Sequence, residues 1–222
     1  PVLAATGTPV VVIGIDFDLN GAPGITCSAG QLVLSRAKLH GGFYGVFGSQ
    51  TCAATIDRTS FSANTFYGAY FSMGTTVAIT NSYFTDHNPS IATLAALIFE
   101  QVSGTVSHTT FSNNTGETPA IHCATSPNLK LSSLISFGHA SSSVEPGCDV
   151  SYSVLDPGYT GPGTNNVTTN PMLVGAGNYH LSAASPVRGM GDPASTMAHD
   201  SDGEARPQPA GSRVDPGADE VP

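Results

Sequence analysis

The sequence is poor in charge, and poorest in positive charge. Only 10% of its 222 residues are charged, with 7 Lys and Arg against 16 Asp and Glu, which gives a formal net charge of −9. Nucleic acids and anionic lipid surfaces are bound through clustered Lys and Arg. A chain of this composition repels both, so no nucleic-acid partner is expected.

Long apolar runs are also missing. No stretch of 18 apolar residues occurs, so the sequence predicts no transmembrane segment. No signal peptide precedes the strand-like sequence that starts soon after Pro1, so we expect that a leader or upstream coils have been removed. The first coil would then present an open edge, which makes it a candidate surface for homo-assembly.

One pattern recurs along the chain. Residues 79–87 resemble residues 56–64 and 106–114: a β-branched residue, polar positions, a Phe, and a polar turn-former three residues later. Weaker copies occur on both sides, and the apolar anchors of the series are Phe17, Leu39, Phe61, Phe84, Phe111, Phe137 and Leu155. A period in the twenties indicates a solenoid, because one repeat cannot bury its own apolar face. Val, Ile, Thr, Phe and Tyr in short runs between Gly, Asn and Ser are typical of strands, and the Leu frame of leucine-rich repeats is absent.

The best copies, Ile79-x-Asn81-Ser82-x-Phe84 and Val106-x-His108-Thr109-x-Phe111-x-x-Asn114, resemble the repeat of the pectate-lyase-like superfamily, which is close to Ile-x-Asn-Cys-x-Phe-x-x-Asn. The resemblance implies an all-β fold, a right-handed single-stranded parallel β-helix of about seven coils. We place the coils in residues 1–156. Residues 157–222, rich in Pro and Gly, are expected to form an irregular C-terminal cap region that packs on the solenoid.

The four cysteines lie in two pairs of equal spacing. Cys27 and Cys52 are 25 residues apart, as are Cys123 and Cys148, and this is about one coil. Because stacked strands are about 4.8 Å apart, each pair is predicted to form a disulfide between adjacent coils. Disulfides indicate an extracytoplasmic compartment. Four free thiols in a cytosolic protein are the alternative; the absence of Cys-x-x-Cys disfavours metal ligation.

The end of the chain carries a series of short phrases: Asn170-Pro171-Met172-Leu173, Gly177-Asn178-Tyr179-His180-Leu181-Ser182, Ser185-Pro186-Val187-Arg188, Asp200-Ser201-Asp202-Gly203-Glu204-Ala205-Arg206-Pro207 and Val214-Asp215-Pro216-Gly217-Ala218-Asp219-Glu220. Together they resemble the C-terminal region of many bacterial secreted β-helix proteins, often labelled a choice-of-anchor region. The resemblance implies a bacterial exported or cell-surface protein. Val187-Arg188 departs from the Ile-Asp that usually follows Ser-Pro there.

Polysaccharide lyases on this fold use a basic residue to abstract a proton and acidic ligands to hold calcium. Arg36 and Arg58 occupy the same offset in adjacent coils, and Lys38 flanks the next anchor, so these three residues are the catalytic candidates. Residues on either side of an inward anchor face outward. The outward positions, which also include Asp16, Asp18, His40 and Asp57, form either an acidic-sugar contact site or plain cross-strand pairs, Asp16 with Lys38 and Asp18 with His40. We favour the cross-strand pairs.

Other catalytic and metal-binding patterns are weak. The carboxylates of the coils share no ladder, which disfavours a glycoside hydrolase, and the scattered His residues form no ligand motif. Asp200 and Asp202 begin like a calcium loop, but position 211 is Gly where an EF-hand needs Glu. Calcium at Asp200 and Asp202 is therefore disfavoured as a hypothesis, and a turn in which Asp202 pairs with Arg206 is preferred.

These patterns favour a secreted or cell-surface bacterial β-helix with a binding, adhesin-like or structural role. Its polar outer faces suit contact with a glycan or a cell-surface component, and its first coil suits self-assembly. The alternative is a polysaccharide lyase, or another carbohydrate-active enzyme, that acts on acidic glycans through Arg36, Lys38 and Arg58.

Overall fold

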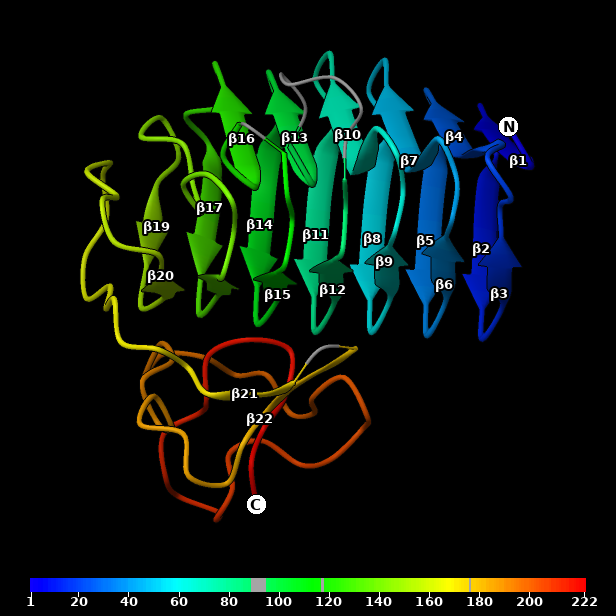
Figure 1. Cartoon of the computed structure of the whole chain (residues 1–222). Coiled ribbons are helices and arrows are strands. Elements are labelled where there is room, and N and C mark those ends of the chain that lie inside the picture. The colour runs from blue at the N-terminus through cyan, green and yellow to red at the C-terminus, as the bar shows by residue number, and fades with distance from the viewer. Residues whose placement is uncertain (89–94, 117, 176) are drawn as a thin grey trace.

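In the computed structural model, which describes residues 1–88, 95–116, 118–175 and 177–222, the chain winds into a parallel β-helix with three sheets (Figure 1). Sheet A contains β1 (Leu3–Thr6), β4 (Pro23–Ser28), β7 (Tyr44–Ser49), β10 (Tyr67–Ser72), β13 (Leu97–Glu100) and β16 (Ile121–Ala124). Sheet B contains β2 (Pro9–Ile13), β5 (Gln31–Ser35), β8 (Ala53–Asp57), β11 (Thr76–Thr80), β14 (Ser103–Ser107), β17 (Leu129–Ser132) and β19 (Val150–Ser151). Sheet C contains β3 (Asp16–Asp18), β6 (Lys38–His40), β9 (Ser60–Ser62), β12 (Tyr83–Thr85), β15 (Thr110–Ser112), β18 (Ile135–Phe137) and β20 (Val154–Leu155).

Six coils carry all three strands, and β19 and β20 make a shortened seventh. The predicted all-β solenoid is confirmed, with a coil count near the expected seven. No α-helix occurs in the part of the chain that the structure describes, and therefore none of the length and hydropathy that a membrane span requires.

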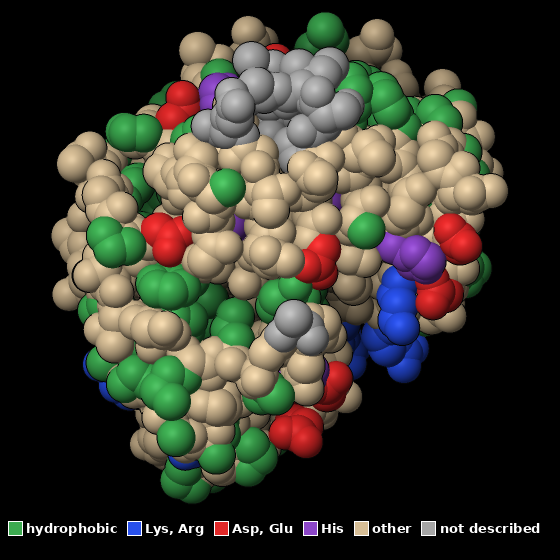
Figure 2. All heavy atoms as spheres, in the orientation of Figure 1, with side chains coloured by type: hydrophobic (Ala, Val, Ile, Leu, Met, Phe, Trp, Pro, Cys, Tyr) green, Lys and Arg blue, Asp and Glu red, His purple; other side chains and the backbone are tan. Residues whose placement is uncertain are grey.

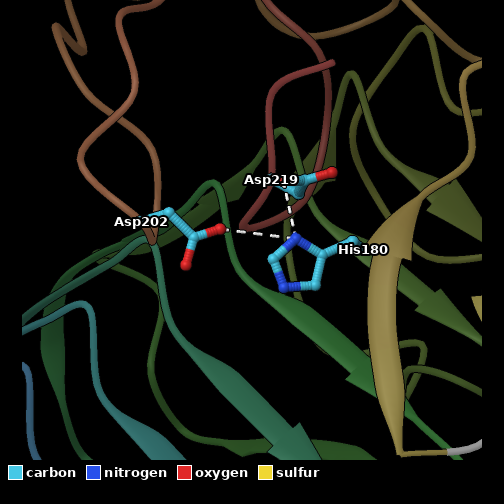
Figure 3. A group of neighbouring side chains, drawn as sticks. All are labelled: His180, Asp202 and Asp219. Atoms are coloured by element: carbon cyan, nitrogen blue, oxygen red, sulfur yellow. Dashed lines mark hydrogen bonds and ion pairs between the residues drawn. The ribbon is translucent and has the colours of Figure 1, made fainter.

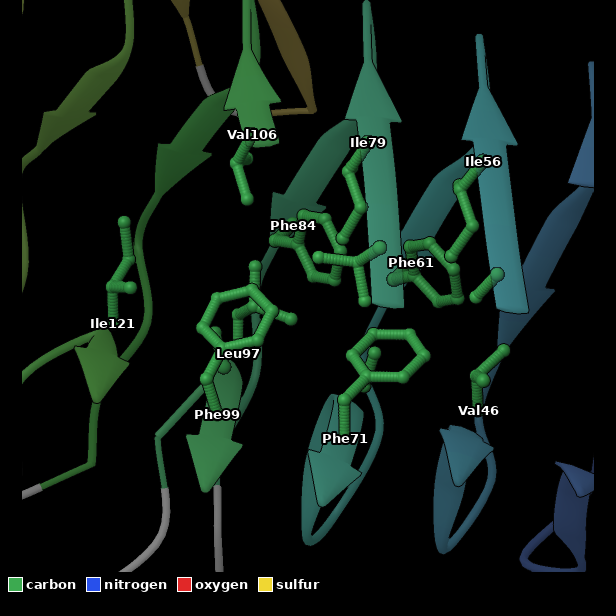
Figure 4. Close-up of a cluster of buried hydrophobic side chains, with 14 of the residues drawn as sticks. Val46, Ile56, Phe61, Phe71, Ile79, Phe84, Leu97, Phe99, Val106 and Ile121 are labelled. Carbon is green, nitrogen blue, oxygen red and sulfur yellow. The ribbon is translucent and has the colours of Figure 1, made fainter. Parts of the chain in front are cut away.

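The core is a set of stacked side chains that point inward from the three sheets (Figure 4). Phe61, Phe84 and Phe111 are in register on neighbouring strands of sheet C, and their ring centroids are 4.6 Å and 5.0 Å apart. Phe17 and Leu39 continue the column toward the N-terminus. Stacking of like rings at the strand spacing explains why the anchors recur in the sequence, since each Phe buries its face against the coils above and below.

The anchor predicted at Phe137 is wrong by one residue. Ser136, not Phe137, pairs with Phe111 on one side and with Leu155 on the other. Side chains alternate along a strand, so this shift turns Ile135 and Phe137 outward. They meet an apolar cluster that the C-terminal part of the chain supplies, which includes Val187. The C-terminal part of the chain thus covers Ile135 and Phe137 from outside the β-helix, while the polar Ser136 takes the inward position.

A left-handed bend separates sheet B from sheet C in every coil. The residues at this position all have φ between 46° and 68°; they are Gly14, Arg36, Arg58, Asn81, His108, Ser133 and Tyr152. Most of them are not glycine, so the required conformation carries strain that the coil-to-coil hydrogen bonds of the neighbouring backbone must offset.

A second ladder lies three residues beyond the sheet C anchors and alternates Asn with His. Asn64 Oδ1 accepts a hydrogen bond from Gly42 N at 2.9 Å, and His87 Nδ1 accepts one from Asn64 N at 3.2 Å. Asn114 Oδ1 accepts one from His87 N at 3.0 Å, and His139 Nδ1 accepts one from Asn114 N at 3.3 Å. Each side chain therefore satisfies a buried backbone N–H of the coil before it.

The C-terminal region has two parts. Residues 157–170 run across the last coil, where Val167 forms a bridge with Val154 and Tyr159 packs on the core. Residues 171–222, which we call the lateral segment, contain the hairpin of β21 (Leu173–Gly175) and β22 (Asn178–Leu181). The lateral segment lies against the outer side of sheet C rather than over the end of the helix, as its yellow-to-red trace shows in Figure 1.

Backbone hydrogen bonds attach the lateral segment to the coils. Ala218 N donates to Thr110 Oγ1 at 2.9 Å, and Gly217 N donates to Ser133 O at 2.8 Å. Inside the segment, Arg206 and Glu220 form an ion pair of 2.9 Å in which both side chains are fully buried. The expected pairing of Asp202 with Arg206 is wrong, because Arg206 is enclosed with Glu220 while Asp202 stays at the surface.

Both predicted disulfides are confirmed. Cys27 is bonded to Cys52 and Cys123 to Cys148, with Cα–Cα distances of 5.8 Å and 5.2 Å. Each bond joins neighbouring coils, since a separation of 25 residues returns the chain to the same edge of the helix one layer on.

Candidate functional site

A groove of about 650 Å³ lies between sheet C and the lateral segment. Its floor is the outer face of β6, β9 and β12, and its wall is the turn into β22 together with Asp202. Figure 2 shows basic side chains gathered beside carboxylates and a histidine where the coils overhang the lateral segment. The lining residues are Lys38, Ser60, Ser62, Tyr83, Thr85, Asp86, Gly177, Asn178, Tyr179, His180 and Asp202.

The floor follows from the three-residue strands of sheet C. In each strand the middle residue is the inward anchor, so its two neighbours point outward. β6 and β9 therefore present Lys38, Ser60 and Ser62 to the groove. From β12 onward the lateral segment covers the same outward positions, and both Thr110 and Ser112 of β15 are buried. The groove lies where this cover begins.

Two tyrosines join the floor to the wall. Tyr179 donates a hydrogen bond to Asp86 Oδ1, and Tyr83 shares one of 3.1 Å with Ser201. Burial and then the contact with Asp86 raise the pKa of Tyr179 to about 12. Burial likewise raises the pKa of Tyr83 above its usual range. Both phenols are therefore neutral near pH 7 and act in the groove as hydrogen-bond donors and apolar surfaces.

Of the three basic candidates, only Lys38 lines the groove. Its side chain is 66% exposed and its Nζ lies 3.9 Å from Asp16 Oδ2. Arg36 is exposed in the bend between β5 and β6. Arg58 Nε donates to Asp57 Oδ2 at 2.8 Å, and Asp57 Oδ1 accepts from Thr80 Oγ1 at 2.8 Å. The hydrogen bonds of Asp57 tie Arg58 into the outer surface of the coils.

The expected cross-strand pairs are in register, Asp16 with Lys38 and Asp18 with His40. Only the first pair forms an ion pair. His40 Nε2 contacts Asp16 Oδ1 at 2.9 Å, so both His40 and Lys38 lean toward Asp16, whereas Asp18 Oδ1 accepts a hydrogen bond from Asn20 N at 3.2 Å. A single exposed carboxylate thus contacts both Lys38 and His40, an arrangement that adds little stability.

The structure separates Asp200 from Asp202. Asp200 is fully buried, and its Oδ1 accepts hydrogen bonds from Asp202 N at 3.0 Å and Glu204 N at 2.8 Å. Asp200 therefore shapes the loop. Asp202 Oδ2 instead lies 3.4 Å from His180 Nδ1, and Asp219 Oδ1 lies 3.0 Å from the same nitrogen (Figure 3). Burial raises the pKa of the Asp219 carboxyl, and the neighbouring His180 opposes that shift.

Of the residues that line the groove, sequence reasoning had proposed Lys38 and Asp202; among those it missed, in the groove or beside it, are Tyr179, His180 and Asp219. All three belong to the C-terminal phrases, in Asn178-Tyr179-His180-Leu181 and Asp219-Glu220. Their separation of about 40 positions follows no coil spacing, so no ladder rule could bring them together. The one signal in the sequence that could have pointed to this site was the presence of His180 and Asp219 in phrases whose other residues form turns and a buried ion pair.

The sequence matches one protein family, described as the right-handed β-helix region, over residues 23–183. The match covers more than half of the chain. The protein belongs to the right-handed β-helix family. Neither a curated protein nor a solved structure matches it. Membership of the family agrees with the three parallel sheets, and the matched residues include β4 to β22, hence the floor and most of the wall of the groove.

Proposed function

We propose that this β-helix is an extracytoplasmic glycan-binding protein that holds a carbohydrate chain in the groove beside sheet C. The observation that carries the proposal is the lining of that groove. Hydroxyl groups, an amide, a lysine, carboxylates and two tyrosines line it, from the strands of sheet C and from the facing part of the lateral segment. Sugars carry closely spaced hydroxyl groups, which need both hydrogen-bond donors and hydrogen-bond acceptors in a binding site. The apolar faces of their rings pack on aromatic side chains. The two disulfides support a location outside the cytoplasm.

Lys38 directs the choice of glycan. It is the basic side chain that reaches the groove, and it is mostly exposed beside the hydroxyls of Ser60 and Ser62. An ammonium placed among hydroxyls favours a chain that carries carboxylates, because a charge-assisted hydrogen bond is stronger than a neutral one. Acidic polysaccharides are therefore the expected ligand class. Display on a bacterial surface, implied by the resemblance of the C-terminal phrases, remains a prediction.

A glycan array followed by titration calorimetry with the best oligosaccharide tests the proposal. Lys38→Ala should weaken binding by about 10- to 100-fold, since hydrogen bonds to charged groups contribute about 1.5–3 kcal/mol. Lys130→Ala is the matched control: Lys130 is similarly exposed, pairs with Asp149 and lies on β17 in sheet B. No binding by the intact protein, or equal binding by the two variants, would contradict the proposal.

One observation favours a second candidate, a polysaccharide lyase. The groove brings a basic residue, Lys38, close to carboxylates, an arrangement that flat coil faces would not provide. In that reaction the base removes the proton next to the uronate carboxylate, and the glycosidic oxygen leaves to give an unsaturated sugar. The test is the ultraviolet absorbance of unsaturated products from uronate polysaccharides. Activity that Lys38→Ala abolishes and Arg36→Ala retains would establish the lyase; a silent panel leaves the binding function.

Self-assembly through the first coil also remains a prediction. The coil exposes the apolar side chains of Val11, Ile13 and Ile15 in this chain. Val11 and Ile13 flank the inward Val12 on β2 and therefore both point outward, and exposed apolar side chains favour contact with another copy. Light scattering over a range of protein concentrations tests it: a mass that rises with concentration supports stacking, and a constant monomer mass contradicts it.

A further inference from the structure

His180, Asp202 and Asp219 reach one point from three separate parts of the lateral segment. His180 comes from β22, Asp202 from the loop that Asp200 shapes, and Asp219 from near the C-terminus (Figure 3). One ligand atom from each, a ring nitrogen of His180 and one oxygen of each carboxylate, lies within 4.8 Å of the other two. The dashed lines of Figure 3 meet at the same nitrogen.

A hydrogen bond alone serves this arrangement poorly. Nδ1 of an imidazole carries one proton at most, and that proton points in one direction. Two carboxylates nevertheless approach it, Asp219 Oδ1 at 3.0 Å and Asp202 Oδ2 at 3.4 Å. Whichever carboxylate accepts the hydrogen bond from Nδ1, the other carboxylate lies close to the same nitrogen without a hydrogen bond. The negative charges of the two carboxylates also repel each other.

The spacing suits a small divalent cation. Zinc binds histidine nitrogen and carboxylate oxygen at about 2.0–2.2 Å, so two ligand atoms lie about 3.0 Å apart at a right angle and about 3.4 Å apart at a tetrahedral angle. The observed separations from Nδ1, 3.0 Å and 3.4 Å, span the same range. Two carboxylates also balance a charge of +2, and a chain of net charge −9 attracts cations.

Two of the three ligands, Asp219 and His180, are held in place by other contacts. The side chain of Asp219 is only 10% exposed, and its second oxygen accepts a hydrogen bond from Leu181 N at 2.9 Å, which aims Oδ1 at the site. The ring of His180 packs beside Tyr83, with centroids 5.9 Å apart. Such supporting contacts set the orientation of metal ligands. His180 and Asp202 also line the groove, so a further coordination position faces solvent there.

We propose that His180, Asp202 and Asp219 form a binding site for one first-row divalent cation, zinc in the first place and manganese in the second. Imidazole suits zinc, the two carboxylates also suit manganese, and calcium prefers a shell made of oxygen alone. Asp202 thus joins a histidine site, and Asp200 takes no part in it. The site stands on these contacts and does not depend on glycan binding.

Titration calorimetry of the full chain, stripped of metal with a chelator, tests the site with Zn²⁺, Mn²⁺ and Ca²⁺ in turn. We expect one Zn²⁺ per chain, weaker binding of Mn²⁺ and the weakest binding of Ca²⁺. Cobalt added in place of zinc should give visible absorption bands of a low-coordinate His and carboxylate site. Asp202→Asn and His180→Asn should each lower zinc affinity by more than about tenfold.

The control is His199→Asn, which removes an exposed imidazole elsewhere in the lateral segment. It should bind zinc like the unmodified chain. Asp202 is 54% exposed, so its substitution should leave thermal unfolding in chelator unchanged and separate metal loss from misfolding. Absence of stoichiometric binding, or binding that both Asp202→Asn and His180→Asn retain, would overturn the proposal and leave a hydrogen-bonded His and Asp pair. Glycan binding in chelator, measured separately, reports on the groove alone.

Discussion

Acid should destabilise this β-helix through histidines that are buried without charge, and His87 is the clearest case. Its side chain is 1% exposed. Nδ1 accepts a hydrogen bond from Asn64 N, so the ring proton is on Nε2, which has no hydrogen-bond partner among the described residues. Burial lowers the pKa of His87 from 6.5 to about 4. A second proton would place a charge inside the coils, where the neighbouring Asp86 offsets only part of the cost of burying it.

The sign and size of the effect follow from linkage. Between pH 6.5 and about 4 the unfolded chain binds a proton at this position and the folded chain does not. The free energy of unfolding therefore falls as the pH falls, and the contribution is fully present only above pH 6.5. From pH 7 to pH 4.5 the loss due to His87 is about 2 kcal/mol. His108 and His139, whose pKa values burial lowers to about 3, act in the same direction.

His87→Asn is the informative variant, because asparagine occupies the equivalent position in the neighbouring coils. Asn64 Nδ2 donates to Leu39 O, and Asn114 Nδ2 donates to Phe84 O, while each Oδ1 caps a backbone N–H. The amide introduced at position 87 should therefore keep the ladder without a titratable group. Urea unfolding followed by circular dichroism at pH 7 and pH 4.5 gives the loss for each protein.

The variant should lose about 2 kcal/mol less than the unmodified protein between the two pH values. The contributions of the other histidines cancel in this difference. His199→Asn, an exposed histidine, controls for the removal of an imidazole in general. Equal losses in the unmodified protein and in His87→Asn would refute the reasoning.

Two further predictions concern stability. Replacing Cys27 and Cys52 by Ser opens a loop of 25 residues and should lower the free energy of unfolding by about 3 kcal/mol, measured with urea; an unchanged midpoint would contradict it. Arg206→Met leaves Glu220 buried without its partner and should cost about 3–5 kcal/mol, seen as faster proteolysis within the lateral segment. The double variant Arg206→Met with Glu220→Leu should recover part of the lost stability. If it is less stable than Arg206→Met alone, the buried charge of Glu220 is not the cause of the loss.

The regular coils were predictable because each repeat meets the same physical demand. An inward Phe in a three-residue strand has to stack on the next Phe, and the strand spacing is constant, so Phe61, Phe84 and Phe111 recur at nearly one period. The same periodicity brought Cys27 beside Cys52. The prediction failed at Phe137, where the residue type was right for an anchor but the register was shifted by one.

The groove was beyond the reach of the sequence pattern. Its floor could be derived, since Lys38 flanks the anchor Leu39 and must point outward. Its wall could not, because the lateral segment has no repeat to give its register. Apolar residues that the coils leave outward, such as Ile135, decide where the segment docks, and they form one cluster with Leu181 and Val187. This docking of the lateral segment places His180 beside Asp202.

The sequence by itself determined the all-β solenoid, its approximate number of coils, the inward columns and both disulfides. These features are local and periodic, so a few residues of one coil imply their neighbours in the next. Only the tertiary structure decided that residues 171–222 lie along sheet C, that Arg206 pairs with Glu220, and that a groove with a histidine and two aspartates forms at the junction. These contacts join segments distant in sequence, and their partners are selected by the shape and apolar surface of the finished coils.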